Sequence, residues 1–331
     1  ENVFIPYLYY MFTTKSIKIM HVQTFGHLII LDFELKVIGI NENVHEILTS
    51  TAESILNTPV ENILKELFKT SFKKIKNLIE TFVNGKPPRA LVTAKINNTA
   101  HYIKISKIND FIYIEAEPQY RKNISTTDLN EIAFLFEGKY NNNWKSVCKA
   151  INRIIHFDRV MVLQVQDTGY CKVIAENNNG KAESFYNKQF SKDYLPQDLI
   201  NHYKDAPYRY IADMEAPSQE FYSTTEIELT GTQLISPPDT KKNYFNFLGV
   251  KTALFFPLYL NGKFWGLVVA HNLTKKFVDL QNRKLCTFIV ENAMSKYETF
   301  VKQGQLEINQ QIQDFQNHLF QRLAFHKTIS C

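Results

Sequence analysis

Two apolar segments that lie far apart in the sequence constrain the fold of this chain more than any other feature. Residues 159–166 and 263–271 are short runs of β-branched and other apolar side chains, which is typical of buried strands. The second run follows another apolar run, 251–260, through Asn261-Gly262, a dipeptide that favours a two-residue β-hairpin turn. We therefore expect these segments to be strands of one sheet.

Helical patterns accompany this sheet. They cover residues 128–140, 144–155 and 196–203, and a further strand-like run covers 171–176. Residues 216–242 show no sustained periodicity and contain Gly231, Pro237 and Pro238, so we expect a long loop there. The mixture of helices and strands predicts an α+β domain.

The N-terminal half has a different order of elements. Residues 27–41 alternate around a turn at Asp32-Phe33-Glu34, which predicts a hairpin, and short helical patterns follow between residues 44 and 83. One of these helices has Ser50 and Glu53 at the spacing of a capping box. Three strand-like runs come next, at residues 90–96, 101–107 and 110–116. Two strands, several short helices and three meandering strands form the element order of a PAS domain, with one antiparallel sheet covered in part by helices.

The C-terminal segment, residues 279–331, reads as one long helix. Apolar residues recur along it at spacings of three, four or seven, opposite a face rich in Gln, Asn and Lys, although Gly304 interrupts the pattern. The stripe consists of Val301, Ile308, Ile312, Phe315, Leu319 and Leu323. The helix packs either on its own domain or against a second copy. We expect a homodimer, because so long an uncovered stripe implies a partner.

Composition narrows the class of protein. With 331 residues the chain can form two domains. Its net charge of +5 is scattered, and a lysine cluster at residues 69–76 is typical of a solvated helix face, so we expect no nucleic-acid partner. No apolar run approaches the ~20 residues of a spanning helix, and no signal peptide is recognisable, so we expect no membrane association.

Cysteine usage and catalytic motifs point the same way. Cys148, Cys171, Cys286 and Cys331 are widely spaced and have no His partner at metal-ligand spacing, which predicts reduced thiols, a cytoplasmic location and no metal site. The sequence lacks the phosphate-binding loops and the nucleophile or zinc motifs of common enzymes. We therefore expect no catalytic residues and no enzymatic activity.

Ordered blocks of sequence resemble the phytochromes over nearly the whole chain. Residues 157–176 resemble the phytochrome run that begins FDRVMVYRF and ends in VAE, and residues 263–271 resemble the WGLIACH strand. Residues 22–26 fall where the PAS domain of phytochromes carries IQPHG. Three shorter blocks at residues 190–196, 203–213 and 233–239 resemble FPASDIP, the R-x-I-x-D strand and R-x-x-S-P-x-H.

This resemblance implies a PAS domain followed by a bilin-binding GAF domain. It implies a figure-of-eight knot as well, in which the N-terminal segment passes under residues 216–242. We divide the chain into an N-terminal segment 1–20, a PAS domain 21–117, a linker 118–127, a GAF domain 128–278 and a long helix 279–331. The output domain of such a protein, or its downstream partner, would lie outside this chain.

Four pocket positions keep the residue of the phytochromes. By the resemblance, Arg209 corresponds to an arginine that grips a bilin propionate and Ser236 to a serine that contacts one. Tyr203 corresponds to a pocket tyrosine, and His271 to the histidine near the outermost pyrrole ring. Each could also have a purely structural role. Arg209 could form a surface ion pair, and His271 could be a hydrogen-bonded polar residue at a strand end.

Other pocket positions depart from the family. The acidic residue of the DIP triplet falls on Tyr194, with Asp193 one place earlier and facing the opposite way if it lies in a strand. The arginine before S-P is Gln233, and a neutral amide cannot replace a bidentate guanidinium on a carboxylate. The remaining departures put Asp239 at the histidine after S-P in an ungapped alignment, Ala253 and Phe255 at two serines, and Leu163 at a tyrosine.

The sequence also predicts that no bilin is attached covalently. Bacterial phytochromes bond bilin through a cysteine about a dozen residues before IQPHG, where this chain has Met11 and its neighbours, and no cysteine precedes Cys148. The plant-type attachment cysteine would lie in the GAF domain near S-P-x-H, but this chain has no cysteine between Cys171 and Cys286. We expect a sensory module with an eroded bilin pocket and no bound cofactor. The alternatives are biliverdin held without a covalent bond and another small ligand in the GAF pocket.

Overall fold

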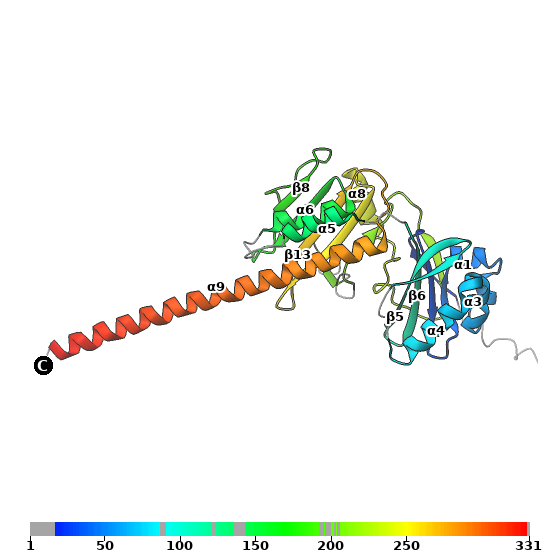
Figure 1. The fold of residues 1–331 in the computed structure, drawn as a ribbon, viewed down its shortest axis with the longest axis horizontal. Helices are drawn as coiled ribbons and strands as arrows, with labels where there is room; N and C mark the ends of the chain where they lie inside the picture. The colour runs from blue at the N-terminus through cyan, green and yellow to red at the C-terminus, as the bar shows by residue number, and fades with distance from the viewer. Residues whose placement is uncertain are drawn as a thin grey trace, which may run out of the picture. The chain divides into compact units, whose positions relative to one another are not determined.

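The computed structural model describes residues 17–86, 91–120, 124–135, 143–191, 195, 200–201, 203 and 206–329. These residues form two compact units, each with its own antiparallel sheet, so the predicted α+β class is confirmed (Figure 1). The first unit draws on segments 1–121, 211–252 and 275–280, and the second on 122–210, 253–274 and 281–331. The chain therefore returns to its first unit after residue 210, so a division into contiguous domains does not describe these two units. The boundaries given above stay predictions.

The first unit is built on a seven-stranded sheet with the order β1-β11-β3-β2-β6-β5-β4. The strands are β1 (Lys18–Val22), β2 (His27–Leu31), β3 (Val37–Asn41), β4 (Val92–Ile96), β5 (Thr99–Ile108), β6 (Phe111–Pro118) and β11 (Gln219–Ser223). Its helices are α1 (Glu42–Ile47), α2 (Ala52–Ile55), α3 (Val60–Phe68), the 3₁₀ turn η1 (Lys69–Ser71) and α4 (Phe72–Val83). The predicted hairpin and all three meandering strands are present.

Local chemistry explains why these elements form where they do. In the β2–β3 connection, Asp32 Oδ1 accepts hydrogen bonds from the backbone N–H groups of Glu34 (3.0 Å) and Lys36 (2.8 Å), which closes the turn. Helix α3 buries its apolar side chains at helical spacing against the sheet. The N-cap of α2 is Thr51, which accepts from Ser54 N–H, so the predicted capping pair of Ser50 and Glu53 is wrong by one residue.

The predicted long loop at residues 216–242 is also wrong. It contains β11 (Gln219–Ser223), which lies between β1 and β3, and it leads into α8 (Asp239–Phe247). Polar residues at the buried positions of β11 hid this strand from pattern reading, because Gln219 and Ser223 are buried on the same face as Phe221. Asn41 Nδ2 donates to Gln219 Oε1 at 2.9 Å, which satisfies this amide inside the sheet.

Within the first unit, Gln23 links the segment that follows β1 to residue 212 and to residues 233–235. Its backbone N–H donates to Leu234 O, and its Nε2 donates to Ile235 O at 3.0 Å. Its Oε1 accepts from the backbone N–H of Ala212 at 3.1 Å. The predicted knot depends on residues before 17, which lie outside the described part, so the knot stays a prediction.

The second unit has a six-stranded sheet with the order β10-β12-β13-β7-β8-β9. Its strands are β7 (Arg159–Val165), β8 (Cys171–Asn178), β9 (Gln189–Phe190), β10 (Arg209–Ile211), β12 (Thr252–Leu260) and β13 (Lys263–Asn272). Its helices are α5 (Thr126–Leu135), α6 (Trp144–Ile155) and α9 (Leu280–Ile329). The predicted β12–β13 hairpin is confirmed, with positive φ at Asn261 and Gly262. The expected helix at 196–203 lies mostly outside the described residues.

Gly266 allows β13 to approach β7. A Cβ atom built on it would lie 2.1 Å from the Leu163 carbonyl oxygen, which is backbone and cannot move aside. In this ladder Leu267 pairs with Leu163, and His271 pairs with Arg159. Any larger residue at position 266 would therefore push apart the two strands that carry the central residues of this unit.

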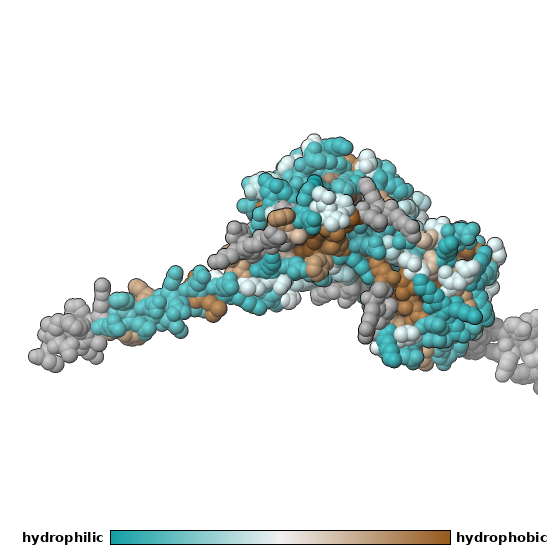
Figure 2. Space-filling view, viewed as in Figure 1, coloured by the Kyte–Doolittle hydropathy of each residue, from teal (hydrophilic) through white to brown (hydrophobic). Residues whose placement is uncertain are grey.

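The predicted long C-terminal helix is confirmed as α9, which is 50 residues long. Its first turns pack on the second unit, where Cys286, Ile289 and Ala293 are almost fully buried. From residue 305 to residue 321 every side chain is exposed, and Figure 2 shows brown apolar residues interrupting the teal surface of this part. At 1.5 Å per residue the helix is roughly 75 Å long, far longer than its own domain can cover.

Candidate functional site

The two faces of the second unit's sheet can be told apart by their contacts. Phe256 lies 6.1 Å from the Tyr208 ring, and the guanidinium of Arg283, from α9, lies over the rings of Tyr208 and Tyr210. These side chains therefore face α9. Because neighbouring residues of a strand point to opposite faces, Phe255 and Arg209 belong to the other face. We call this other face the ligand face.

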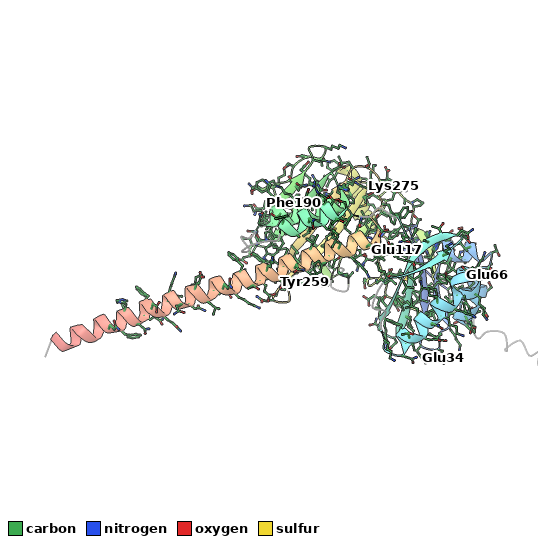
Figure 3. The ribbon with its side chains drawn as sticks, viewed as in Figure 1. Glu34, Glu66, Glu117, Phe190, Tyr259 and Lys275 are labelled. Carbon is green, nitrogen blue, oxygen red and sulfur yellow. The ribbon has the colours of Figure 1, made fainter. Side chains whose placement is uncertain are left out.

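Aromatic rings fill the ligand face. Phe255 lies 6.4 Å from Tyr203 and is edge-on to His271 at 6.3 Å. Phe264 stacks on Tyr203 at 6.5 Å and meets Tyr259 of β12, labelled in Figure 3, edge-on at 5.8 Å. Burial raises the pKa of Tyr203, and the nearby charge of Arg209 opposes that rise. Tyr203 and Arg209 are thus close enough to interact, and both are buried.

Arg159 is a member of this face that sequence reasoning missed. It is 2% exposed, and its Nη2 lies 2.9 Å from His271 Nδ1. A guanidinium can only donate, so Nδ1 accepts, and the imidazole is neutral with its proton on Nε2. The sequence signal was available, because a charged residue opens strand β7, which is otherwise apolar except for Gln164. Its cross-strand pairing with His271 could not be known without the register.

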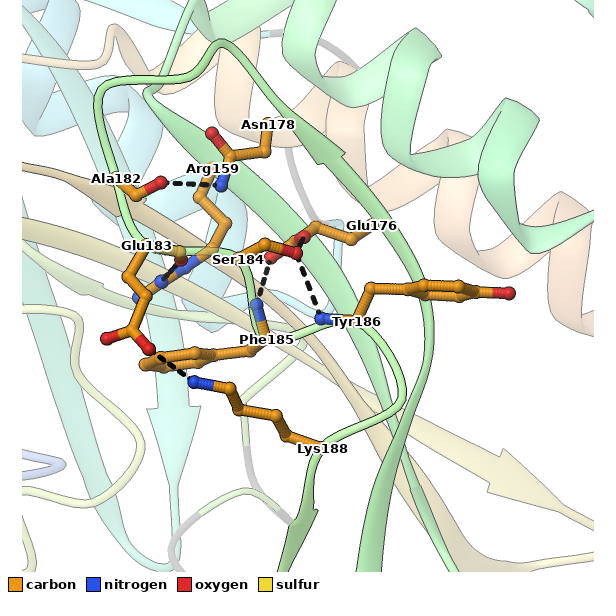
Figure 4. A network of polar contacts seen from close by, with 9 residues as sticks. All are labelled: Arg159, Glu176, Asn178, Ala182, Glu183, Ser184, Phe185, Tyr186 and Lys188. Carbon is orange, nitrogen blue, oxygen red and sulfur yellow. Dashed lines mark hydrogen bonds and ion pairs between the residues drawn. The ribbon is translucent and has the colours of Figure 1, made fainter.

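The segment between β8 and β9 fixes Arg159 from outside (Figure 4). The guanidinium donates to the Glu183 carbonyl oxygen and lies 3.8 Å from the centre of the Phe185 ring. Glu176 accepts from the backbone N–H of Phe185 at 2.9 Å and from the Ser184 hydroxyl. This network holds Phe185 against Arg159, so the arginine is satisfied by protein groups on several sides.

The structure brings some of the predicted site residues together and not others. Tyr203, Arg209, Phe255 and His271 share the ligand face. Ala253 lies two residues before Phe255 in β12, so alternation places it on the same face, and both it and Leu163 are fully buried. Asp193 and Tyr194 lie outside the described residues, as does the side chain of Asp239, which opens α8.

The last two predicted residues, Gln233 and Ser236, belong to the first unit. The backbone N–H of Gln233 donates to the buried Glu115 carboxylate at 2.8 Å. Ser236 lines a small cavity of about 220 Å³ beside Gln23. Gln233 is 3% exposed, and the Glu115 contact, together with a 2.6 Å ion pair from Lys104 to the same carboxylate, fixes the backbone there.

The three described cysteines are buried. Burial raises the pKa of Cys171 to about 11, and it raises the pKa of Cys148 and Cys286 further. Over the described ranges, no group of three or more His, Cys, Asp or Glu residues could hold a metal ion. None of the described helices is long and apolar enough to cross a membrane.

Comparison with known proteins defines the class to which this architecture corresponds. Residues 13–119 match the model of a PAS fold family. The chromophore-binding domain of an unusual bacteriophytochrome from R. palustris superposes with a TM-score of 0.74 at 19% identity, covering 85% of this chain and 96% of that domain. That of a Stigmatella aurantiaca phytochrome gives 0.72 at 16% identity, covering 83% and 95%. The fold is that of a phytochrome chromophore-binding domain, a PAS domain followed by a GAF domain.

Sequence relatives agree with the structural ones. Cyanobacterial phytochrome A of Nostoc sp. is 25% identical over 288 residues, which is 81% of this chain and 37% of the relative. Phytochrome C of Arabidopsis thaliana is 22% identical over 314 residues, which is 82% of this chain and 28% of the relative. The predicted resemblance to the phytochromes is thus confirmed, and the chain spans about a third of the length of these relatives.

Proposed function

We propose that this chain is the sensory core of a phytochrome-like protein whose GAF pocket is eroded and binds no bilin covalently. The observation that carries the proposal is the position of Phe255 between Tyr203 and His271. The ring occupies a position where, by the family resemblance, a serine would face the chromophore. A buried phenyl ring adds volume and removes a hydroxyl donor, so it acts against a polar, bulky ligand in both respects.

The charge of the ligand face supports the same proposal. A bilin carries two propionates, and Arg209 remains to meet one of them. By the family resemblance, the sequence position of the second arginine holds Gln233, whose neutral amide binds a carboxylate more weakly than a guanidinium. Arg159 does not compensate, because its Nη2 is directed at His271 and its Nη1 at the Glu183 carbonyl.

Covalent attachment needs a reactive thiol. The thiolate is the nucleophile, and Cys148, Cys171 and Cys286 are buried with raised pKa values. In the sequence no cysteine precedes Cys148. These facts support a module without a thioether-linked chromophore.

A second candidate is a photoreceptor that holds biliverdin without a covalent bond. It is favoured by the buried pair of Tyr203 and Arg209 on the ligand face. A related form of this candidate is a different small ligand on the same face, because the GAF fold does not itself specify a ligand. Both require that the aromatic rings of this face move aside.

Titration of the purified chain with biliverdin, followed by absorbance, tests the main proposal and this candidate together. We expect no saturable binding at micromolar biliverdin, for the wild type or for Arg209→Ala. Saturable binding that Arg209→Ala weakens about tenfold or more, but the matched surface change Arg153→Ala does not, would establish the second candidate instead. Arg153 is half-exposed on α6 and pairs with Asp128 and Glu131, away from the ligand face.

We further propose that the chain signals through α9 as a homodimer and has no catalytic activity of its own, any output being supplied elsewhere. Exposed apolar side chains along the far half of α9 support the dimer. Two packings of paired helices can differ by only a few kcal/mol, so a small event in either unit could bias them. The buried thiols support a reducing, cytoplasmic location.

A further inference from the structure

A cavity on the α9 side of the second unit's sheet has features that the proposed function does not use. Its volume is about 510 Å³, and it lies between the N-terminal end of α6, the edge formed by β7, β8 and β13, and α9. Trp144, Trp265 and Tyr297 form one wall of it. Because Trp265 meets residues of α6 and α9, the aromatic wall of the cavity lies on the side of the sheet that carries these helices.

The aromatic wall is continuous. Trp144 and Trp265 are stacked with ring centres 5.2 Å apart and planes at 28°. Tyr297 lies 5.5 Å from Trp144 and 4.9 Å from Trp265. Trp144 is 3% exposed, but Trp265 and Tyr297 are only half-buried, so their outer faces are open to the cavity. A flat aromatic ring could stack there.

The polar groups of the wall are unevenly satisfied. Trp265 shares a hydrogen bond with the Tyr297 hydroxyl, and an indole nitrogen can only donate. Trp144 Nε1 is buried and has no acceptor among the residues that the structure describes. A buried donor left without an acceptor is unfavourable by about 1–3 kcal/mol, so this N–H is a specific place for an acceptor atom.

Groups that accept hydrogen bonds complete the lining. Glu176 lies in the wall, and each of its carboxylate oxygens accepts one protein hydrogen bond, which leaves further lone pairs. Gln164 and Asn178 also line the cavity. Lys145 balances the charge of Glu176, so the lining favours a ligand that is neutral overall. It should offer both donors and acceptors.

We propose that this cavity binds a planar nitrogen heteroaromatic ring of purine size. The ring stacks on Trp265 beside the tilted ring of Tyr297, a ring nitrogen or carbonyl accepts from Trp144 Nε1–H, and an amino group donates to Glu176. Because Tyr297 belongs to α9, an occupied cavity contacts the helix that leaves this unit. The proposal does not depend on whether the ligand face holds a chromophore.

Tryptophan emission tests this proposal directly, because the chain has only two tryptophans and both line the cavity. Adenosine, titrated into the full chain, should change this emission saturably, whereas ribose should not. Trp144→Phe keeps a ring but removes the N–H, so it should weaken adenosine binding about fivefold. Trp265→Leu removes the open stacking surface and should weaken it more. Tyr170→Phe, an exposed tyrosine outside the cavity, is the matched control and should leave the affinity unchanged.

Three results would overturn the proposal. The first is no saturable change up to about 10 mM adenosine, an upper limit set by the weakest useful affinities. The second is equal affinity for Trp144→Phe and Tyr170→Phe when circular dichroism shows both to be folded. The third is emission that depends on protein concentration but not on adenosine, which would mean that a second copy of the chain fills the cavity. Calorimetric titration gives the affinity independently for Trp265→Leu, whose emission is reduced.

Discussion

At the residue scale, Arg159 and His271 are cross-strand neighbours on the second unit's ligand face. By resemblance, His271 and Phe255 were predicted as pocket residues, and in the structure the Phe255 ring lies 6.4 Å from Tyr203 and 6.3 Å from His271. The sequence did not indicate that Arg159 would bond to the histidine. That contact depends on the β7–β13 register and on the segment between β8 and β9, neither of which is encoded by nearby residues.

Replacing Arg159 with methionine should destabilise the second unit by about 2–4 kcal/mol, because it leaves His271 Nδ1 and the Glu183 carbonyl without their donor. Arg153→Met should cost less than about 1 kcal/mol, since its ion pairs are exposed. Urea unfolding of both variants measures the difference. Equal losses would mean that the buried arginine contributes nothing beyond a surface charge.

His27 should make the first unit sensitive to acid. Burial, followed by the charge of His101, lowers the pKa of His27 to about 4, while its hydrogen bond with Asn43 opposes this. The unfolded chain, with a pKa near 6.5, takes up this proton first, so stability is full above about pH 6.5 and falls towards pH 4. The loss should reach up to about 3 kcal/mol.

Unfolding free energies measured between pH 7 and pH 4, values that bracket this transition, test the effect. His27→Gln should flatten the pH dependence, and His318→Gln, on the exposed part of α9, should not. The idea fails if both variants keep the wild-type slope.

At the element scale, patterning succeeded where one face of an element is clearly apolar. The expected helix at 144–155 matches α6 at both ends, because Asn143 caps it and its buried residues recur at helical spacing. The β12–β13 hairpin was specified by Asn261-Gly262. β11 could not be predicted, because its burial depends on neighbours from residues 18–22 and 39–41 and its buried side chains are partly polar.

Replacing glycine with alanine should lower stability in one element and raise it in another. Gly266→Ala should destabilise the second unit by about 2 kcal/mol or more, because its Cβ would meet the Leu163 backbone. Gly304→Ala, in α9 with nothing within 4 Å, should stabilise the helix by up to about 1 kcal/mol. Thermal unfolding followed by circular dichroism distinguishes them. A tolerated Gly266→Ala would mean that the close approach of β7 and β13 is not required.

The exposed apolar stripe of α9 predicts the effect of charge on assembly. Ile308 and Ile312 are more than half exposed, and they lie one turn apart on the same face. Ile308→Asp with Ile312→Asp should convert a dimer into a monomer in light scattering after gel filtration. Changing Gln303 and Gln310 to Asp is the control and should leave the dimer intact. A wild type that is monomeric at all concentrations would rule out the dimer.

At the scale of the whole molecule, the order of domains could be predicted because each has a characteristic succession of elements. The return of residues 211–252 to the first unit was not predicted, because the sequence analysis placed this segment in the GAF domain. The packing inside the pocket could not be predicted in the same way, because it depends on which side chains of several strands share one face of the sheet. The family resemblance identified the substitutions, whereas the packing of Phe255 against His271 required the fold.

The central proposal is that aromatic rings such as that of Phe255 occupy the ligand face and that none of the described thiols is placed to attach a bilin. The most direct test is the absorption spectrum of the chain produced together with biliverdin and then passed through gel filtration. We expect no red-absorbing band that elutes with the protein, and no fluorescent zinc–bilin adduct after denaturing electrophoresis. A strong red band that elutes with the protein would contradict the claim, and persistence of the pigment after denaturation would contradict it completely.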